Sequence, residues 1–285
     1  MNARKPLYLI GLLGAALTAA SPAMAEEAAA AAPAAAAPAP AEPAPAEPAS
    51  PHSFSANIGI YGQYVFRGIT YTNERPALQG GFDYAHSSGV YLGVWGSNVD
   101  KDALYGNTLE IDLYGGYARQ ITQDIGINVG FLQFYYPDNE HPNFGAGTKE
   151  SPNTTELNAA ATWKWFTLKY SYAVSDFFGL NNKSLGDGKG DSRGSDYTEL
   201  NFNYTLPYDI NLALHAGRQT VEGRSVADYT DYLVGVNKNF SIAGSTGWNA
   251  GVNFTTTNAR HSWYVDGKGT YTGDDHVVLF LKRTF

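Results

Sequence analysis

The sequence predicts an all-β fold, an antiparallel up-and-down β-barrel of about 12 strands that spans a membrane. Three observations predict it. Apolar and polar residues alternate through most of the chain after residue 54, short links alternate with long ones, and alternate apolar residues lead up to a terminal Phe285. Because a strand sends successive side chains to opposite faces, such alternation gives each strand one apolar and one polar face.

The composition suits this class and excludes several others. The chain of 285 residues has 31 Gly and 20 Tyr, and only 16% of its residues are charged, which is typical of strands and tight turns. The formal net charge of −8, without any Lys/Arg cluster, argues against nucleic acid as a partner, since phosphate binding needs a basic face. The absence of cysteine excludes disulfides, thiolate metal sites and Cys nucleophiles.

Residues 1–25 have the pattern of a secretory signal peptide. Arg4 and Lys5 form a positive start, an apolar run follows from Leu7 to Ala20, and small residues at 23 and 25 mark a cleavage site. The run is shorter than the roughly 20 residues that a membrane-spanning helix needs, so a membrane anchor is the weaker alternative. We expect the mature protein to be exported to the cell outer membrane of a Gram-negative bacterium.

Residues 26–51 are almost entirely Ala and Pro with four Glu. Pro removes backbone donors, and nothing in the segment can form a core. The composition predicts a disordered periplasmic linker, which acts either as a solubilising tether or as an arm toward the cell wall.

The barrel itself is predicted over residues 54–285. The first strand pattern runs from 54 to 70, and its apolar parity comprises Phe54, Ala56, Ile58, Ile60, Tyr64 and Phe66. Eleven further segments repeat the alternation: 76–84, 89–100, 108–118, 124–136, 155–163, 165–175, 197–206, 210–217, 231–240, 247–255 and 276–285. Each offers about 9–11 residues, enough to cross a bilayer at a tilt. Aromatic residues near the predicted strand ends suit the lipid–water boundary: Tyr64, Phe66, Tyr84, Tyr117, Trp163, Trp165 and Trp248.

The links between these segments are sorted by length. The tight ones are 86–89, 119–124, 164–165, 207–209 and 241–245, and the long polar ones include 137–152, 179–195, 220–227 and 258–275. Short turns at one end and long loops at the other are typical of bacterial outer-membrane barrels. A soluble sandwich could bury the same apolar faces, but it has no reason to sort its loops. A helical membrane protein is excluded, because no apolar segment of helix length follows residue 25.

Four segments carry a family resemblance: YVFRGIT (64–70), PALQGGFDY (76–84), GVYLGVWGSNVD (89–100) and LEIDLYGGY (109–117). They resemble the TorF family of porins, and the similarity covers the whole predicted barrel. It implies an outer-membrane β-barrel with a channel role, in contact with membrane lipid and lipopolysaccharide. The terminal Phe285 resembles the sorting signal of outer-membrane proteins, although Arg283 departs from its usual apolar pattern. The resemblance assigns no binding residues.

If the apolar parity faces lipid, the other parity faces the lumen. The charged candidates for lining a pore are Arg67, Asp83, Glu110, Asp112, Glu156, Lys169, Glu199 and Asp231. Their acidic excess predicts a mild preference for cations. Alternatively, these groups pair and close the lumen, and a simple antiparallel register places Arg67 within reach of Asp83. Glu110 and Asp112 could contact a cation, but we favour a solvated patch neutralised by Arg.

The lumen-facing residues leave open whether a pore exists. Gly93 and four further glycines (81, 116, 126 and 130) provide space, whereas large rings at Tyr61, Tyr91, Trp95 and Tyr114 occupy it. Twelve strands give a lumen between those of filled eight-stranded barrels and open sixteen-stranded porins. The function that we favour is a monomeric channel for passive diffusion of small solutes.

Two alternatives belong to other classes. One is a closed structural or adhesive barrel, and the other is an outer-membrane lipid hydrolase. For the hydrolase, His215 is the only His inside a strand body, and the chain lacks a G-x-S-x-G motif. Two groups of loop residues lack convincing metal-ligand spacing: Asp138, Glu140 and His141, and Asp187, Asp191 and Asp196. We therefore expect no enzyme activity, no cofactor and no metal.

Overall fold

The computed structural model describes residues 50–138 and 150–285. The predicted signal peptide and nearly all of the predicted linker lie outside these residues, as do Glu140 and His141. The first barrel strand begins at His52, two residues before the predicted start of the barrel.

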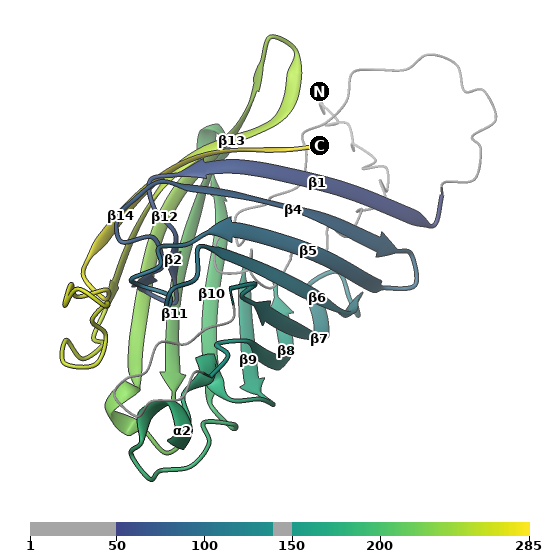
Figure 1. The fold of residues 1–285 in the computed structure, drawn as a ribbon. Coiled ribbons are helices and arrows are strands. Elements are labelled where there is room, and N and C mark those ends of the chain that lie inside the picture. The colour runs from purple at the N-terminus through teal and green to yellow at the C-terminus, as the bar shows by residue number, and fades with distance from the viewer. Residues whose placement is uncertain (1–49, 139–149) are drawn as a thin grey trace, which may run out of the picture.

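Twelve antiparallel strands form a closed ring in the described part of the chain, which confirms the predicted fold class (Figure 1). Consecutive strands pair with each other, and the first pairs with the last, from Asn57 opposite Thr284 to Tyr61 opposite Phe280. The barrel strands are β1 (His52–Tyr61), β4 (Ala77–His86), β5 (Val90–Asn98), β6 (Leu109–Gln120), β7 (Ile125–Tyr135), β8 (Thr154–Trp163), β9 (Phe166–Ala173), β10 (Asp196–Leu206), β11 (Ile210–Thr220), β12 (Tyr229–Ile242), β13 (Ser245–Thr257) and β14 (His276–Thr284).

The two faces of the wall are sorted as the alternation predicts, with the apolar face outward. Phe82 on β4 and Leu279 on β14 are 68% and 65% exposed, whereas polar residues of the same strands, such as Gln79 and His276, are buried inside the ring. This is the reverse of a water-soluble protein and the pattern of a lipid-facing barrel. Among the residues that the structure describes, no helix is long and apolar enough to cross a bilayer.

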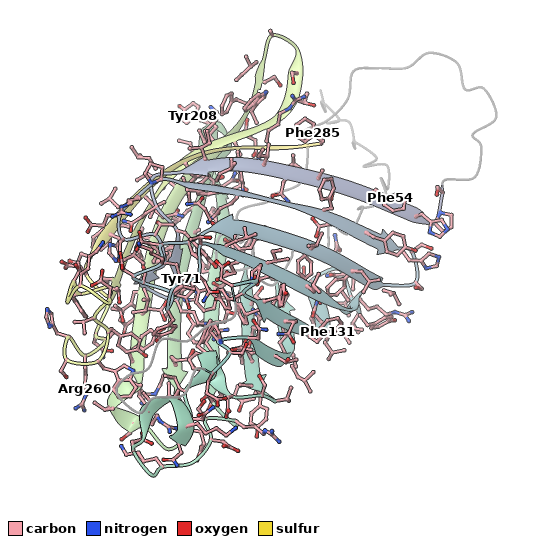
Figure 2. The ribbon with its side chains drawn as sticks, in the orientation of Figure 1. Phe54, Tyr71, Phe131, Tyr208, Arg260 and Phe285 are labelled. Carbon is pink, nitrogen blue, oxygen red and sulfur yellow. The ribbon has the colours of Figure 1, made fainter. Side chains whose placement is uncertain are left out.

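The links are sorted by length between the two ends of the ring, as predicted. Two-residue and three-residue turns, such as 164–165 and 207–209, lie at one end, where Figure 2 labels Tyr208. Long links lie at the other end, where Figure 2 labels Arg260. These long links contain the only described α-helix, α2 (Asn182–Leu185), and the 3-10 turns η1 (Phe177–Gly179) and η3 (Ser225–Ala227); η2 (Pro207–Asp209) is a tight turn. Asn181 starts α2 by accepting hydrogen bonds from the backbone N–H groups of Lys183 and Ser184.

The first strand is shorter than predicted, because β1 ends at Tyr61 and residues 62–76 fold inward. We call residues 62–76 the inner segment. It contains a small separate sheet, the inner hairpin, made of β2 (Val65–Phe66) and β3 (Ile69–Thr70). Arg67 and Gly68 form its turn, with φ of 47° and 77°, and positive φ at both central residues is the geometry of a two-residue type I′ hairpin.

The prediction that Tyr64 and Phe66 lie at the lipid boundary is therefore wrong. They are 7% and 6% exposed and pack inside the ring. The alternation of apolar and polar residues continues through the inner segment because the hairpin also has an apolar face, which packs against aromatic residues of the lumen. Figure 2 labels Tyr71, another residue of the inner segment, among the side chains inside the ring.

A charge placed on the outer face tests its contact with hydrocarbon. Phe82 lies near the middle of β4, so Phe82→Arg should lower the free energy of unfolding in lipid by about 2–4 kcal/mol. Tyr208→Arg, at an exposed tight turn, should cost only about 0–1 kcal/mol. Urea unfolding in phospholipid vesicles measures both, and equal costs would contradict a lipid-facing outer wall.

Candidate functional site in the barrel lumen

The turn of the inner hairpin contacts the wall at β12 and β13. A Cβ atom placed on Gly68 would lie 2.8 Å from Cβ of Asp231 on β12 and 3.1 Å from Cβ of Thr257 on β13. Backbone hydrogen bonds hold the segment at its start, from Gly62 N to the Leu279 carbonyl (2.8 Å), and on β3, from Thr70 N to the Thr272 carbonyl (2.8 Å). The inner segment is therefore attached to the wall at several points inside the ring.

Arg67, at the turn, makes the principal polar contact of the hairpin. Its Nη1 and Nη2 atoms donate to Oε1 and Oε2 of Glu156 on β8, at 3.0 and 2.9 Å, and Nη1 also donates to Oε1 of Gln219 on β11 at 2.9 Å. The guanidinium carbon lies 4.1 Å from the ring centre of Tyr197 on β10 and 4.7 Å from that of Phe66. A bidentate Arg–carboxylate pair is strong and geometrically specific, and this one joins the hairpin to three wall strands.

The predicted pairing of Arg67 with Asp83 is wrong. Asp83 lies opposite Ser55 in the wall, and its Oδ1 accepts a hydrogen bond from the Tyr114 hydroxyl at 2.6 Å. The prediction assumed that Arg67 continues the first strand. Because the chain leaves the wall after Tyr61, Arg67 faces β8 instead.

The predicted solvated patch at Glu110 and Asp112 is also wrong, because both side chains are completely buried on β6. The hydroxyls of Tyr64 and Tyr136 donate to Oε1 and Oε2 of Glu110, at 2.6 and 2.5 Å. Neither carboxylate oxygen of Asp112 has a hydrogen-bond partner among the described residues. The site therefore holds one carboxylate bound by two phenols beside one without a bonded partner.

A second polar network lies on β9 to β12. The Nε2 atom of His215 lies 3.0 Å from Oδ2 of Asp231 and 2.9 Å from the Tyr197 hydroxyl, and its Nδ1 lies 2.7 Å from Oδ1 of Asn201. Beside it, Nζ of Lys169 lies 2.9 Å from Oε1 of Glu199. The lumen side of these strands is therefore a continuous chain of hydrogen bonds and ion pairs.

The structure places all eight candidate residues toward the interior. Arg67 lies on the inner hairpin, and the other seven lie on wall strands, where they face inward: Asp83, Glu110, Asp112, Glu156, Lys169, Glu199 and Asp231. Their role in lining a solute path stays a prediction.

Glycines make room for several of the large lumen side chains. A Cβ atom on Gly93 would overlap the ring of Tyr114, and one on Gly217 would overlap Tyr197. Gly93 was predicted to provide space for the lumen, and in the structure a tyrosine ring occupies that space.

Two cavities border the inner hairpin. The larger, about 820 Å³, lies at the long-loop end, and we call it the vestibule. Its lining includes Ile69 and Tyr71 of the inner segment and the aromatic loop residues Phe177, Phe178, Trp263 and Tyr264. The smaller, about 40 Å³, has room for only a few water molecules and is lined by residues that include Tyr64, Gly68, Gln79, Trp95 and His215. Phe66 lines both, so the hairpin is the partition between them.

Ion pairs tie the long loops together around the vestibule. Nζ of Lys268 lies 2.6 Å from Oδ2 of Asp102, and Nε of Arg224 lies 3.0 Å from Oδ2 of Asp187. The hydrogen bond from Lys268 holds the pKa of Asp102 below its usual value, and that of Lys268 is raised in turn. Asp102 and Asp187 are therefore already paired.

No pattern in the sequence predicts the aromatic cluster on which the inner hairpin packs. Phe66 lies 5.4 Å from Phe134 and 6.2 Å from Phe178, measured between ring centres. Phe134 has inward parity on its strand, and Phe178 comes from a long link, so no local pattern joins them. The available signal was the Arg67-Gly68 dipeptide, since Gly favours turns with positive φ.

Loss of the Glu156 carboxylate should destabilise the docked hairpin. In Glu156→Gln the buried guanidinium of Arg67 loses its counter-charge, so the free energy of unfolding should fall by up to about 3–5 kcal/mol. The double variant Arg67→Gln/Glu156→Gln should recover part of this loss, because neither residue is then a buried unpaired charge.

Urea unfolding of the detergent-folded protein measures both variants. The exposed pair Lys164–Asp124, whose Nζ and Oδ2 lie 3.9 Å apart, is the control: Asp124→Asn should cost less than about 1 kcal/mol. Additive losses for the two Arg67–Glu156 substitutions would show that the pair is not coupled.

Comparisons with solved structures find other barrels at low sequence identity. The KdgM porin is 9% identical, with 81% of this chain and 99% of that chain covered and a TM-score of 0.48. The KdgM porin in complex with disordered oligogalacturonate is also 9% identical over the same shares, with a TM-score of 0.49. OprD from Pseudomonas aeruginosa is 13% identical, with 82% and 66% covered and a TM-score of 0.35.

These TM-scores are below 0.5, so the fold assignment rests on the strand pairing of this chain itself. No curated protein sequence matches the chain. The name TorF, suggested by the sequence motifs, is not confirmed. A family model described as "Bacterial protein of unknown function (Gcw_chp)" matches residues 45–285, and the chain belongs to this Gcw_chp family.

Proposed function

We propose that the protein is an outer-membrane channel for passive diffusion of small solutes, and that the inner hairpin closes its lumen. The observation that carries the proposal is the partition itself: a segment that is not part of the wall lies between two cavities of a polar interior. The inner hairpin is a separate two-stranded sheet, so it can leave the lumen while every pair of barrel strands stays intact. A removable partition is the arrangement that a gated path needs.

The apolar outer face supports the membrane location. It would be surrounded by membrane lipid, with lipopolysaccharide at the long-loop end, and the tight turns would face the periplasm. Residues 26–51 would then extend from the barrel on the periplasmic side, where they could reach the cell wall. In lipid a closed barrel has every backbone group of its wall paired internally.

The buried charges favour a barrel with a solute path over a barrel whose interior is filled only for stability. Replacing buried ion pairs by apolar residues of similar volume is often neutral or stabilising, so stability alone gives no reason to keep them. Glu110, Asp112, Glu156 and Glu199 are all 2% exposed or less. With Arg67 withdrawn, acidic groups would outnumber basic ones along the lumen, which supports a preference for cations.

Closure also favours a second candidate, a closed structural barrel whose long loops contact other molecules. The small 40 Å³ cavity below the hairpin is the observation in its favour. The lipid hydrolase gains no support from the contacts of His215, which include Tyr197, Asn201, Asp231 and Glu199.

A shortened inner segment separates the two candidates. The Tyr71 N–H donates to the Tyr64 carbonyl at 2.8 Å, so a Gly-Gly link can replace residues 65–70 without moving either residue. In planar bilayers the wild type should give small or infrequent current steps, and the shortened variant larger and longer ones, because the partition is gone. In a KCl gradient, the reversal potential should lie closer to the equilibrium potential of K⁺ than to that of Cl⁻.

A closed structural barrel makes the opposite prediction. Its remaining lumen side chains would still block the path, so neither protein would conduct. Circular dichroism and heat-modifiable migration on gels should confirm that the shortened variant has folded, which keeps an absence of current interpretable.

A further inference from the structure

Arg67 occupies a complete binding site for a guanidinium group. Glu156 accepts two parallel hydrogen bonds, Gln219 accepts a third, and the face of Tyr197 lies 4.1 Å from the guanidinium carbon. Glu156, Gln219 and Tyr197 are 2%, 0% and 1% exposed. A carboxylate fork beside an aromatic face is the chemistry that selects a planar guanidinium over a compact ammonium group.

The wall holds this site in place by contacts that do not involve Arg67. Nε2 of Gln219 donates to the carbonyls of Asp196 and Thr220, at 3.0 and 3.1 Å. The Tyr197 hydroxyl lies 3.0 Å from Oδ1 of Asp231, and Gly217 provides the space for the Tyr197 ring. Because Tyr197 and Gln219 lie on the wall strands β10 and β11, they would keep their positions after the inner hairpin leaves.

The neighbouring wall strand β6 adds two further carboxyl groups, Glu110 and Asp112. Both oxygens of Asp112 lack hydrogen-bond partners among the described residues, and Glu110 is bound by neutral phenols. Strand β7 pairs with the strands of both acids: its Leu132 lies opposite Glu156 of β8, and its Phe134 lies opposite Asp112 of β6. Glu156 and Asp112 are therefore separated by β7 alone. The oxygens of Asp112 are therefore open to a hydrogen-bond donor of a solute.

We propose that Arg67 is an internal substitute for the cationic group of a solute, and that guanidinium-bearing solutes compete with it for Glu156 and release the inner hairpin. This inference rests on the proposed channel function and adds a substrate class to it. The solute would enter through the vestibule, whose floor is the hairpin. Displacement of Arg67 would then open the partition.

The tether sets the strength of the competition. Arg67 is attached to the wall at both ends of the inner segment, so its effective concentration at Glu156 is of millimolar order or above. A solute must match that concentration to displace it, which predicts weak binding, in the range of about 10 mM. Weak binding suits a channel, since a solute must also leave its site.

L-arginine and L-citrulline provide a matched pair of probes. Citrulline has an uncharged ureido group in place of the guanidinium group of arginine. At about 10 mM, arginine should raise the open probability of the wild-type channel several-fold, and citrulline should leave it unchanged. Equal responses to the two compounds would overturn the proposal.

A second readout reports the position of the hairpin without requiring current. The chain has no cysteine, so Ile69→Cys introduces a single thiol on the vestibule side of the hairpin, at a residue that is 7% exposed. Arginine should accelerate its reaction with a membrane-impermeant maleimide several-fold over citrulline. If labelling is unchanged while the channel conducts, the proposed displacement of Arg67 is contradicted and the channel function is not. If labelling is accelerated but no current flows, the channel function is contradicted and the displacement of Arg67 is not.

Substitution of the proposed anchor completes the test. In the Ile69→Cys background, Glu156→Gln should abolish the difference between arginine and citrulline, because the carboxylate fork is lost. Glu222→Gln, at an exposed carboxylate of the β11–β12 link, should keep it. A full arginine response in Glu156→Gln would place the cation elsewhere and contradict the proposal.

Discussion

The structure depends on the closure of β1 onto β14. In lipid, an unpaired strand edge would leave a row of backbone donors and acceptors without partners, and the ring removes both edges at once. Closure also decides the environment of every side chain, since alternate residues must face either hydrocarbon or lumen. Twelve strands enclose more space than the wall side chains need, and the inner segment takes up part of it.

The way in which the interior is filled explains its chemistry. Aromatic rings of the inner segment supply packing, and two charged or phenolic tips attach it at defined points: Arg67 at Glu156 and Tyr64 at Glu110. An apolar plug could be as stable, but it would not carry a bond that a solute can replace. The buried charges therefore make more sense as contacts that exchange partners than as a source of stability.

The alternation of residues was sufficient to predict most of the wall. It located twelve segments and the tight links, and it placed Tyr61, Tyr91, Trp95 and Tyr114 on the lumen side, where each is 3% exposed or less. The alternation did not predict the path of the inner segment, because it shows that one face of a strand is apolar and not whether that face meets lipid or the lumen. Phe66 meets an apolar surface in the lumen as it would in lipid, so both environments produce the same pattern.

The sequence by itself determined a wall of alternating strands and the end at which its long loops lie, because these follow from local periodicity and turn chemistry. Only the tertiary structure decided that residues 62–76 turn inward and that Arg67 binds Glu156, 89 positions along the chain. That pairing depends on where a closed ring places β8 relative to the hairpin tip. No local rule contains such information, since it arises from the curvature of the whole sheet.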